Sequence, residues 1–102
     1  MTHMAVWRVR VPAESVADLL AVREEGIAEA QRLCPELLRA ELVQVSEDQW
    51  LEVITWSVAD GEDRLMAREG EFDALNRLHA LMGEVIGVDR GEVRHSRGAV
   101  AA

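Results

Sequence analysis

The order of the elements predicts an α+β fold of the ferredoxin-like, split βαβ class. Apolar residues alternate with strand spacing or recur with helix spacing in the order β-α-β-β-α-β. A chain of 102 residues has the length of one domain, and 49% apolar residues suffice for a core. We therefore expect one domain over residues 1–102, with its ordered core at about 4–95 and a loose tail at 96–102.

The first half of the predicted fold is a strand followed by a long helix. Met4–Val11 alternates, with Trp7, Val9 and Val11 on one face, and Pro12 ends this strand. Glu14–Leu33 has the spacing of an amphipathic helix, which Cys34-Pro35 stops.

The second half begins with a hairpin and returns to the sheet through helices. Leu37–Val45 and Gln49–Ser57 are strands around the polar turn Ser46-Glu47-Asp48. Gly70 separates two helical segments. These helices cover Asp60–Arg68 and Glu71–Gly83, and a last strand covers Val85–His95. The predicted sheet has four antiparallel strands with helices on one face.

The strand Gln49–Ser57 is apolar on both faces. Trp50, Ile54 and Trp56 share one face, and Leu51, Val53 and Thr55 share the other. A sheet that is apolar on both sides needs a second cover. We therefore expect a homodimer in which two sheets pack face to face as a dimeric α+β barrel.

Composition excludes several classes of partner. The net charge is −8 and acidic residues are spread along the chain, so nucleic acids and anionic membranes are poor partners. No apolar run approaches the roughly 20 residues of a membrane span, and the N-terminus lacks the apolar segment of a signal peptide. Cys34 is the single cysteine, which suits a reducing compartment. A cytoplasmic protein is expected.

Arg23 is the sharpest signal within the first predicted helix. It lies in the middle of an apolar stripe, which comprises Val16, Leu19, Leu20, Ile27, Ala30 and Cys34 with Gly26 at its margin. A charge in a core-facing stripe is costly unless it is paired or lies in a solvated cavity. Glu52 and Glu41 are the candidate partners. The sequence leaves open whether Arg23 forms a structural pair or serves a binding site.

Two further positions are candidates for a small-molecule site. Trp56 ends an apolar strand and precedes a helix, which is typical of a cavity wall. Trp7 and Trp50 suit a core or an interface, although Trp50 shares the face of Trp56 and stays a candidate for substrate contact. His79 lies with Phe72 at the edge of a helix face and could act as a base, or be a helix histidine without a role.

Cofactor motifs are lacking. The chain has no CxxC, no HExxH and no pair of histidines at ligand spacing, so no dedicated metal site is predicted. No glycine-rich nucleotide loop and no nucleophile elbow occur. We therefore expect no cofactor.

The stretch Leu51-Glu-Val-Ile-Thr-Trp56, the spacing from Trp56 to Asp60 and the later Phe72-Asp-Ala-Leu resemble the antibiotic biosynthesis monooxygenase family. The resemblance covers roughly Val6 to Arg94. It implies a small homodimer of the dimeric α+β barrel group. Some members oxidise polycyclic aromatic polyketide intermediates with molecular oxygen and no cofactor, and a tryptophan at the position of Trp56 is implicated in that reaction.

The resemblance also implies roles and shows departures. Arg23 would hold a substrate anion, and His79 or Glu52 would take the proton. The quinone-forming members use a tyrosine and an asparagine near the tryptophan, whereas this chain has no tyrosine and Glu52 stands near the asparagine position. The first strand lacks the asparagine of the haem-degrading branch, which disfavours haem degradation.

The predicted function is therefore a cofactor-independent monooxygenase that acts on an aromatic or polyketide-like small molecule. The predicted catalytic residues are Arg23, Glu52 and His79, and the predicted substrate contacts are Trp50, Trp56 and Phe72. Two alternatives remain: a ligand-binding or regulatory homodimer without catalysis, and a cofactor-free isomerase or cyclase that uses the same cavity.

Overall fold

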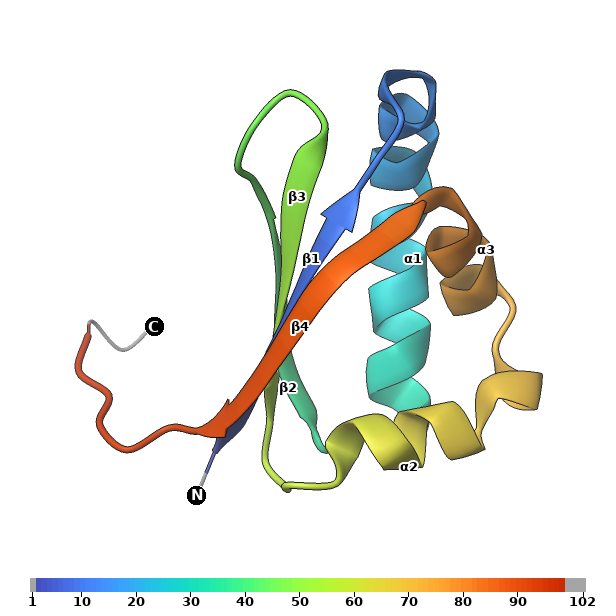
Figure 1. Cartoon of the computed structure of the whole chain (residues 1–102). Coiled ribbons are helices and arrows are strands. Elements are labelled where there is room, and N and C mark those ends of the chain that lie inside the picture. Colours follow the sequence, from blue (N-terminus) through green and yellow to red (C-terminus); the bar gives the residue numbers. More distant parts are fainter. Residues whose placement is uncertain (1, 99–102) are drawn as a thin grey trace.

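Four antiparallel strands form one sheet in the order β2-β3-β1-β4, and the helices pack on one face of it (Figure 1). The computed structural model describes residues 2–98. Its elements are β1 (His3–Arg10), α1 (Val16–Leu33), β2 (Leu37–Gln44), β3 (Gln49–Trp56), α2 (Gly61–Ala67), α3 (Ala74–Leu81) and β4 (Glu84–Glu92). The predicted α+β, ferredoxin-like arrangement is confirmed.

The main differences from the predicted boundaries lie before α1, before α3 and in the last strand, which ends at Glu92 rather than at His95. A 3₁₀ turn at Ala13–Ser15 precedes α1, so the long helix begins later than predicted. Phe72 follows a second 3₁₀ turn and is extended, with φ −95° and ψ 138°. It therefore precedes α3 and does not share a helix with His79, contrary to the prediction. Of the predicted tail, residues 96–98 belong to no element, and residues 99–102 lie outside the described residues.

The pairing of β1 with β3 confirms the predicted division into two faces. Val9 lies opposite Trp50, and Trp7 lies opposite Glu52. These residues alternate with the opposite face and point towards the helices, where Val9 and Trp50 belong to the hydrophobic core. The inward face of β3 thus carries a carboxylate between two buried tryptophans, Trp50 and Trp56.

Helix α1 covers the sheet and packs closely against α3. A Cβ atom added to Gly26 would lie 3.3 Å from the carbonyl oxygen of Ala74 and 3.3 Å from Cδ2 of Leu78. Gly26, which the sequence places at the margin of the apolar stripe, is buried and permits the close approach of the two helices. The sequence pattern puts Leu20 in the buried stripe, but the residue is 51% exposed, because the helix turns this position away from the sheet.

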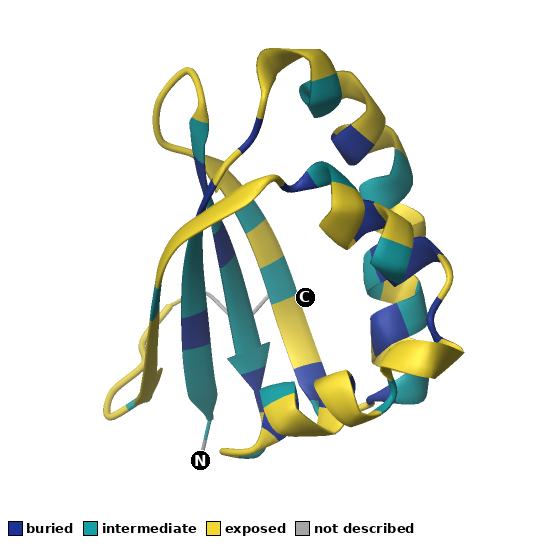
Figure 2. Ribbon diagram, turned by 45° about the vertical axis from the view of Figure 1, so that its right-hand side comes forward, coloured by how far each residue is buried: buried dark blue, intermediate teal, exposed yellow. Residues whose placement is uncertain are grey.

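The opposite face of the sheet carries no helix (Figure 1). Met4 and Val6 on β1 and Leu51, Val53 and Thr55 on β3 lie on it, and all are only partly buried (Figure 2). Val6 is opposite Val53, so apolar side chains meet across the two central strands. This open apolar face is the surface for which the sequence predicts a second cover.

The junction between β3 and α2 depends on a glycine. Ideal Cβ geometry at Gly61 would place that atom 2.2 Å from Cδ2 and 2.3 Å from Cε3 of Trp56. The indole therefore packs directly on the backbone of the first residue of α2. Because only glycine leaves this space, Gly61 sets the position of α2 on the inner side of the sheet.

The variant Gly61→Ala is expected to lower the free energy of unfolding by about 1–3 kcal/mol, because the added methyl group displaces Trp56 or α2. Urea denaturation followed by tryptophan fluorescence measures this loss. Gly70→Ala is the control, since nothing lies within 4 Å of a Cβ atom at Gly70. Equal stability of Gly61→Ala and the wild type would show that the close packing is not a constraint.

Candidate functional site

A cavity of about 370 Å³ lies between the helix-covered face of the sheet, α2 and α3. Its volume lies in the range of small-molecule sites. Most of its wall is apolar and is contributed by several elements, including Ile27, Ile54, Leu65, Leu75, Leu78 and Met82. Such a cavity desolvates a ligand and strengthens any electrostatic contact made inside it.

Glu52 is a buried carboxylate in the wall of this cavity, with the residue 5% exposed. Nη2 of Arg23 donates a hydrogen bond of 2.7 Å to Oε1 of Glu52, and Nη1 donates to Oε2. The guanidinium comes from α1 and the carboxylate from β3, so this bidentate pair joins the helix to the sheet. Of the two partners considered for Arg23, Glu41 is exposed and Glu52 is the one bound.

Burial raises the pKa of Glu52, and the hydrogen bonds and charge of Arg23 oppose that rise. The two influences differ in kind, since burial removes water from the carboxylate while Arg23 replaces part of its hydration. Glu52 in its ionised form is consequently a stronger base than an exposed glutamate. A base of this kind in an apolar cavity is suited to proton abstraction from a weak acid.

Trp56 and His79 also line the cavity. Trp56 is 2% exposed and presents a large apolar surface at the end of β3. His79 comes from α3, and desolvation lowers the pKa of its imidazole, although Glu69 raises it. The residue is exposed, and a pKa below that of an ordinary histidine leaves the imidazole neutral at neutral pH and able to accept a proton.

A second polar cluster in the cavity wall was not predicted from the sequence. Oε2 of Glu62 on α2 accepts a hydrogen bond from Nε1 of Trp7 on β1, and Oε1 forms an ion pair with Nε of Arg90 on β4. The guanidinium carbon of Arg90 lies 5.1 Å from the centroid of the Trp7 ring. These partners are 55 and 28 residues from Glu62 in the chain, so no local pattern indicates them.

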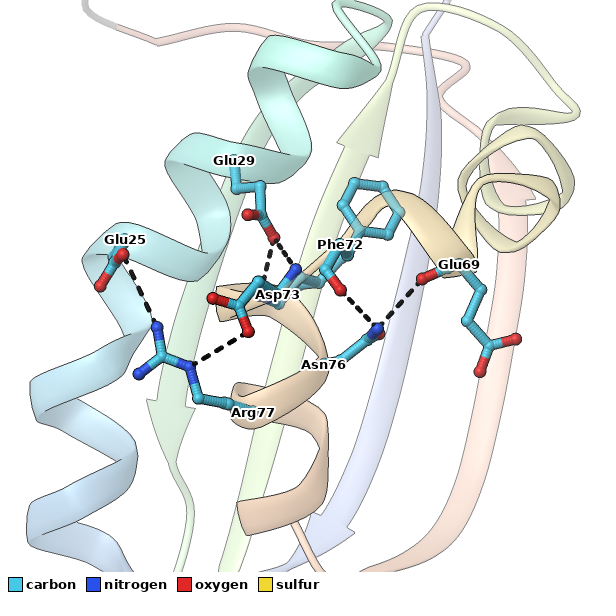
Figure 3. Close-up of polar contacts among 8 residues, drawn as sticks. Glu25, Glu29, Glu69, Phe72, Asp73, Asn76 and Arg77 are labelled. Atoms are coloured by element: carbon cyan, nitrogen blue, oxygen red, sulfur yellow. Dashed lines mark hydrogen bonds and ion pairs between the residues drawn. The ribbon is translucent and has the colours of Figure 1, made fainter.

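The helix that carries His79 is held in place by a carboxylate from α1 (Figure 3). Oε1 of Glu29 accepts hydrogen bonds from the backbone N–H groups of Asp73 at 2.9 Å and Leu75 at 3.1 Å. These groups belong to the start of α3, where helical N–H groups lack partners within the helix. The N–H of Leu75 contributes most to lowering the pKa of Glu29. Glu29 thus caps α3 from a neighbouring helix.

The turn before α3 is held by Asn76, whose Nδ2 donates to the carbonyl oxygens of Phe72 at 2.7 Å and Glu69 at 3.0 Å (Figure 3). Arg77 points away from the sheet and pairs with Glu25 at 3.6 Å, with its side chain 55% exposed. Arg77 therefore does not belong to the cavity wall.

The structure brings three of the six predicted site residues together in the cavity wall: Glu52, Trp56 and His79. Arg23 lies behind Glu52 and binds it. Trp50 and Phe72 are 6% and 7% exposed and belong to the hydrophobic core. These three residues support the site from behind and do not line the cavity.

Within residues 2–98, no group of three or more His, Cys, Asp and Glu side chains is placed to hold a metal ion. None of the helices in this part of the chain combines the length and the apolar character needed to cross a membrane.

Solved structures share this architecture. A candidate antibiotic biosynthesis monooxygenase from Chloroflexus aurantiacus J-10-fl is 14% identical and has a TM-score of 0.73, over 96% of this chain and 98% of that one. SnoaB, a cofactor-independent oxygenase from Streptomyces nogalater, is 18% identical and has a TM-score of 0.69, over 93% of this chain and 95% of that one. A protein from Caulobacter crescentus CB15 matches with 16% identity, a TM-score of 0.68 and coverage of 92% and 91%.

The chain has the fold of the antibiotic biosynthesis monooxygenases. Protein-family models and curated protein sequences give no match to it. The predicted resemblance is therefore confirmed in the fold, while at these identities the chemistry has to be argued from the residues of this chain.

The variant Arg23→Met is expected to lower the free energy of unfolding by about 3–5 kcal/mol at neutral pH, because it leaves the Glu52 carboxylate buried without a partner. The pKa of Glu52 is then raised further above that of the unfolded chain. Protonation on acidification favours the folded state, so the variant regains stability as the pH falls through the folded pKa.

Urea denaturation between pH 5 and pH 8 measures this dependence. The double variant Arg23→Met/Glu52→Gln is the matched control, because it removes the buried charge and with it the pH dependence. The same loss of stability at both pH values would contradict the assignment of the pair.

Proposed function

We propose that this chain is a cofactor-independent oxygenase that acts on a phenolic or enolisable aromatic small molecule. The observation that carries the proposal is the carboxylate of Glu52, which is buried in the wall of an apolar cavity and oriented by Arg23. The fold shared with SnoaB, itself a cofactor-independent oxygenase, supports it.

The reaction needs a base, a dry cavity and oxygen. Glu52 removes a proton from a methylene group that is activated by neighbouring aromatic rings, and the carbanion spreads its charge over those rings. The carbanion reduces O₂ and forms a hydroperoxide with a new C–O bond. Loss of water then gives a carbonyl group, so that the methylene group and O₂ become a carbonyl group and H₂O. The electrons come from the substrate itself.

The other cavity residues have distinct roles in this proposal. Trp56 supplies a flat apolar wall against which an aromatic ring packs. His79, neutral at neutral pH, takes a proton at the rim. Arg23 is a positioning residue: both of its terminal nitrogens bind Glu52, so it sets the direction and basicity of that carboxylate and does not hold the substrate anion.

An isomerase or cyclase in the same cavity is the second candidate. Glu52 and His79 line one cavity and have pKa values shifted in opposite directions, upward for the carboxyl and downward for the imidazole. Such a pair can move a proton between two atoms of a ligand without oxygen. A binding protein without catalysis would use the same apolar wall.

With 1,8-dihydroxyanthrone as the probe, we expect oxygen uptake and formation of the corresponding anthraquinone. Glu52→Gln should lower kcat by at least about 100-fold, because it removes the base and keeps the shape. Trp56→Phe should mainly raise KM. An oxygen electrode and absorbance of the product measure these effects.

Glu24→Gln is the matched control, since Glu24 is an exposed glutamate of α1 outside the cavity. Ligand binding without oxygen uptake would contradict the oxygenase and favour the binding protein. Exchange of the methylene hydrogens with solvent under anaerobic conditions, without uptake in air, would favour the isomerase.

We also infer that the protein works as a homodimer through the open face of its sheet. The support is the partly buried apolar set on β1 and β3, which no helix covers. A second copy would bury these side chains against their equivalents, as two packed sheets do.

The variant Val53→Asp is therefore expected to convert a dimer into a monomer, because it places a charge at the centre of this face. Sedimentation velocity at micromolar concentration measures the mass. Leu20→Asp is the control, since Leu20 is exposed on α1 away from the sheet. A monomeric wild type, or a dimer unaffected by Val53→Asp, would contradict the inference.

A further inference from the structure

We propose that the cavity selects uncharged aromatic ligands against anionic ones, and that Glu62 enforces this selection by neutralising Arg90. The proposal rests on the cavity being the ligand site of the proposed function. It adds the charge class of the ligand and names the residue that sets it.

The cavity wall carries more negatively charged side chains than positively charged ones. Within the described residues, three carboxylates line the cavity, and Arg90 is the only arginine that does so; the set is Glu52, Glu62, Asp63, His79 and Arg90. His79 does not add a positive charge at neutral pH, because desolvation lowers the pKa of its imidazole. A ligand anion therefore has one possible cationic partner in the wall.

Arg90 is already engaged on two sides. Its Nε forms an ion pair with Oε1 of Glu62, and its guanidinium lies over the ring of Trp7 at 5.1 Å from the centroid. Oε2 of Glu62 is in turn fixed by the indole N–H of Trp7. The Glu62 side chain is 17% exposed, so water replaces little of this contact. Arg90 and Glu62 thus face the cavity as an ion pair with no net charge.

The second arginine near the cavity is equally committed. Arg23 stands behind Glu52 and donates from both terminal nitrogens to its carboxylate. An incoming anion would meet Glu52 and Asp63 in an apolar wall, where removal of its hydration is costly and like charges repel. A neutral phenol avoids this repulsion and can bind favourably, because its O–H group can donate a hydrogen bond to the Glu52 carboxylate.

The cavity volume limits the size of this ligand. A cavity of about 370 Å³ lies at the lower end of the range of small-molecule sites. That space suits an uncharged phenol of two or three fused rings.

Asp63 provides an internal control for the role of Glu62. It is the next residue of α2, carries the same charge and lines the same cavity. In contrast to Glu62, it forms no ion pair within residues 2–98. Removing the charge of Asp63 changes the potential of the wall without freeing a cation, whereas removing the charge of Glu62 frees Arg90.

Binding of 2-naphthol and 2-naphthoate, which share a ring system and differ in charge, tests the proposal. Isothermal titration calorimetry at neutral pH without oxygen separates binding from turnover, so an enzyme without oxygenase activity can still support the selection. The wild type is expected to bind 2-naphthol at least about tenfold more tightly than 2-naphthoate, because the carboxylate of 2-naphthoate would be buried without a cationic partner.

Glu62→Gln should raise the affinity for 2-naphthoate about fivefold and leave that for 2-naphthol nearly unchanged. The gain is limited because the Arg90 side chain is 55% exposed and water screens it. The amide oxygen of the glutamine still accepts the hydrogen bond of Trp7, which preserves the wall. Asp63→Asn should give a smaller gain, and Glu62→Gln/Arg90→Met should lose the gain.

Three results would overturn the proposal: equal or tighter binding of 2-naphthoate by the wild type, equal gains in Glu62→Gln and Asp63→Asn, or binding of neither compound. If Glu62→Gln does not fold, the comparison of the two ligands on the wild type still decides whether the cavity selects against the anion, and Arg90→Met, which removes the cation that Glu62 neutralises, is expected to leave that selection unchanged.

Discussion

The ion pair between Arg23 and Glu52 is the interaction on which the site depends. Arg23 lies among the apolar residues of α1, and Glu52 lies between two buried tryptophans of β3, so neither charge could be buried alone. Their bidentate contact makes both burials possible and joins the helix layer to the sheet. It also holds the carboxylate of a residue of the cavity wall in one fixed orientation, as a positioned base requires.

The elements that surround this carboxylate are positioned by contacts between distant parts of the chain. The backbone of Gly61 lies against the indole of Trp56, which sets α2 over one end of the cavity. The carboxylate of Glu29 binds the N–H groups at the start of α3, which carries His79. Both helices are short, so their placement comes from these contacts rather than from intrinsic helix stability.

The shared architecture and the site carry different information. Fold likeness at 14–18% identity describes how the strands and helices are arranged, and many chemistries can use one arrangement. The polar groups of this cavity belong to this chain: a paired glutamate, a neutral histidine, and a glutamate that joins a tryptophan to an arginine. An apolar cavity with one oriented base and an excess of carboxylates in its wall follows from them, and this is the basis of the chemistry proposed.

Much of the fold could be predicted from local pattern. Alternation places Trp50, Ile54 and Trp56 on one face of β3, and the charge within an apolar stripe of α1 indicates that Arg23 is either paired or solvated in a cavity. The predictions for Leu20, as a buried residue, and for Phe72, as a helical residue, are wrong. A helical wheel contains no information on where a helix begins or on which of its faces the rest of the protein covers.

The order of the elements and the two faces of the sheet follow from the amino-acid sequence, because they depend on the periodicity of strands and helices. The cost of burying charge also marks Arg23 as a residue that needs a partner or a solvated cavity. Three features depend on the folded structure: Glu52 is the partner of Arg23, Trp50 and Phe72 lie behind the cavity, and Glu62 joins Trp7 to Arg90. These contacts join residues far apart in the chain, and they depend on strand register and on the path of α2 across the sheet.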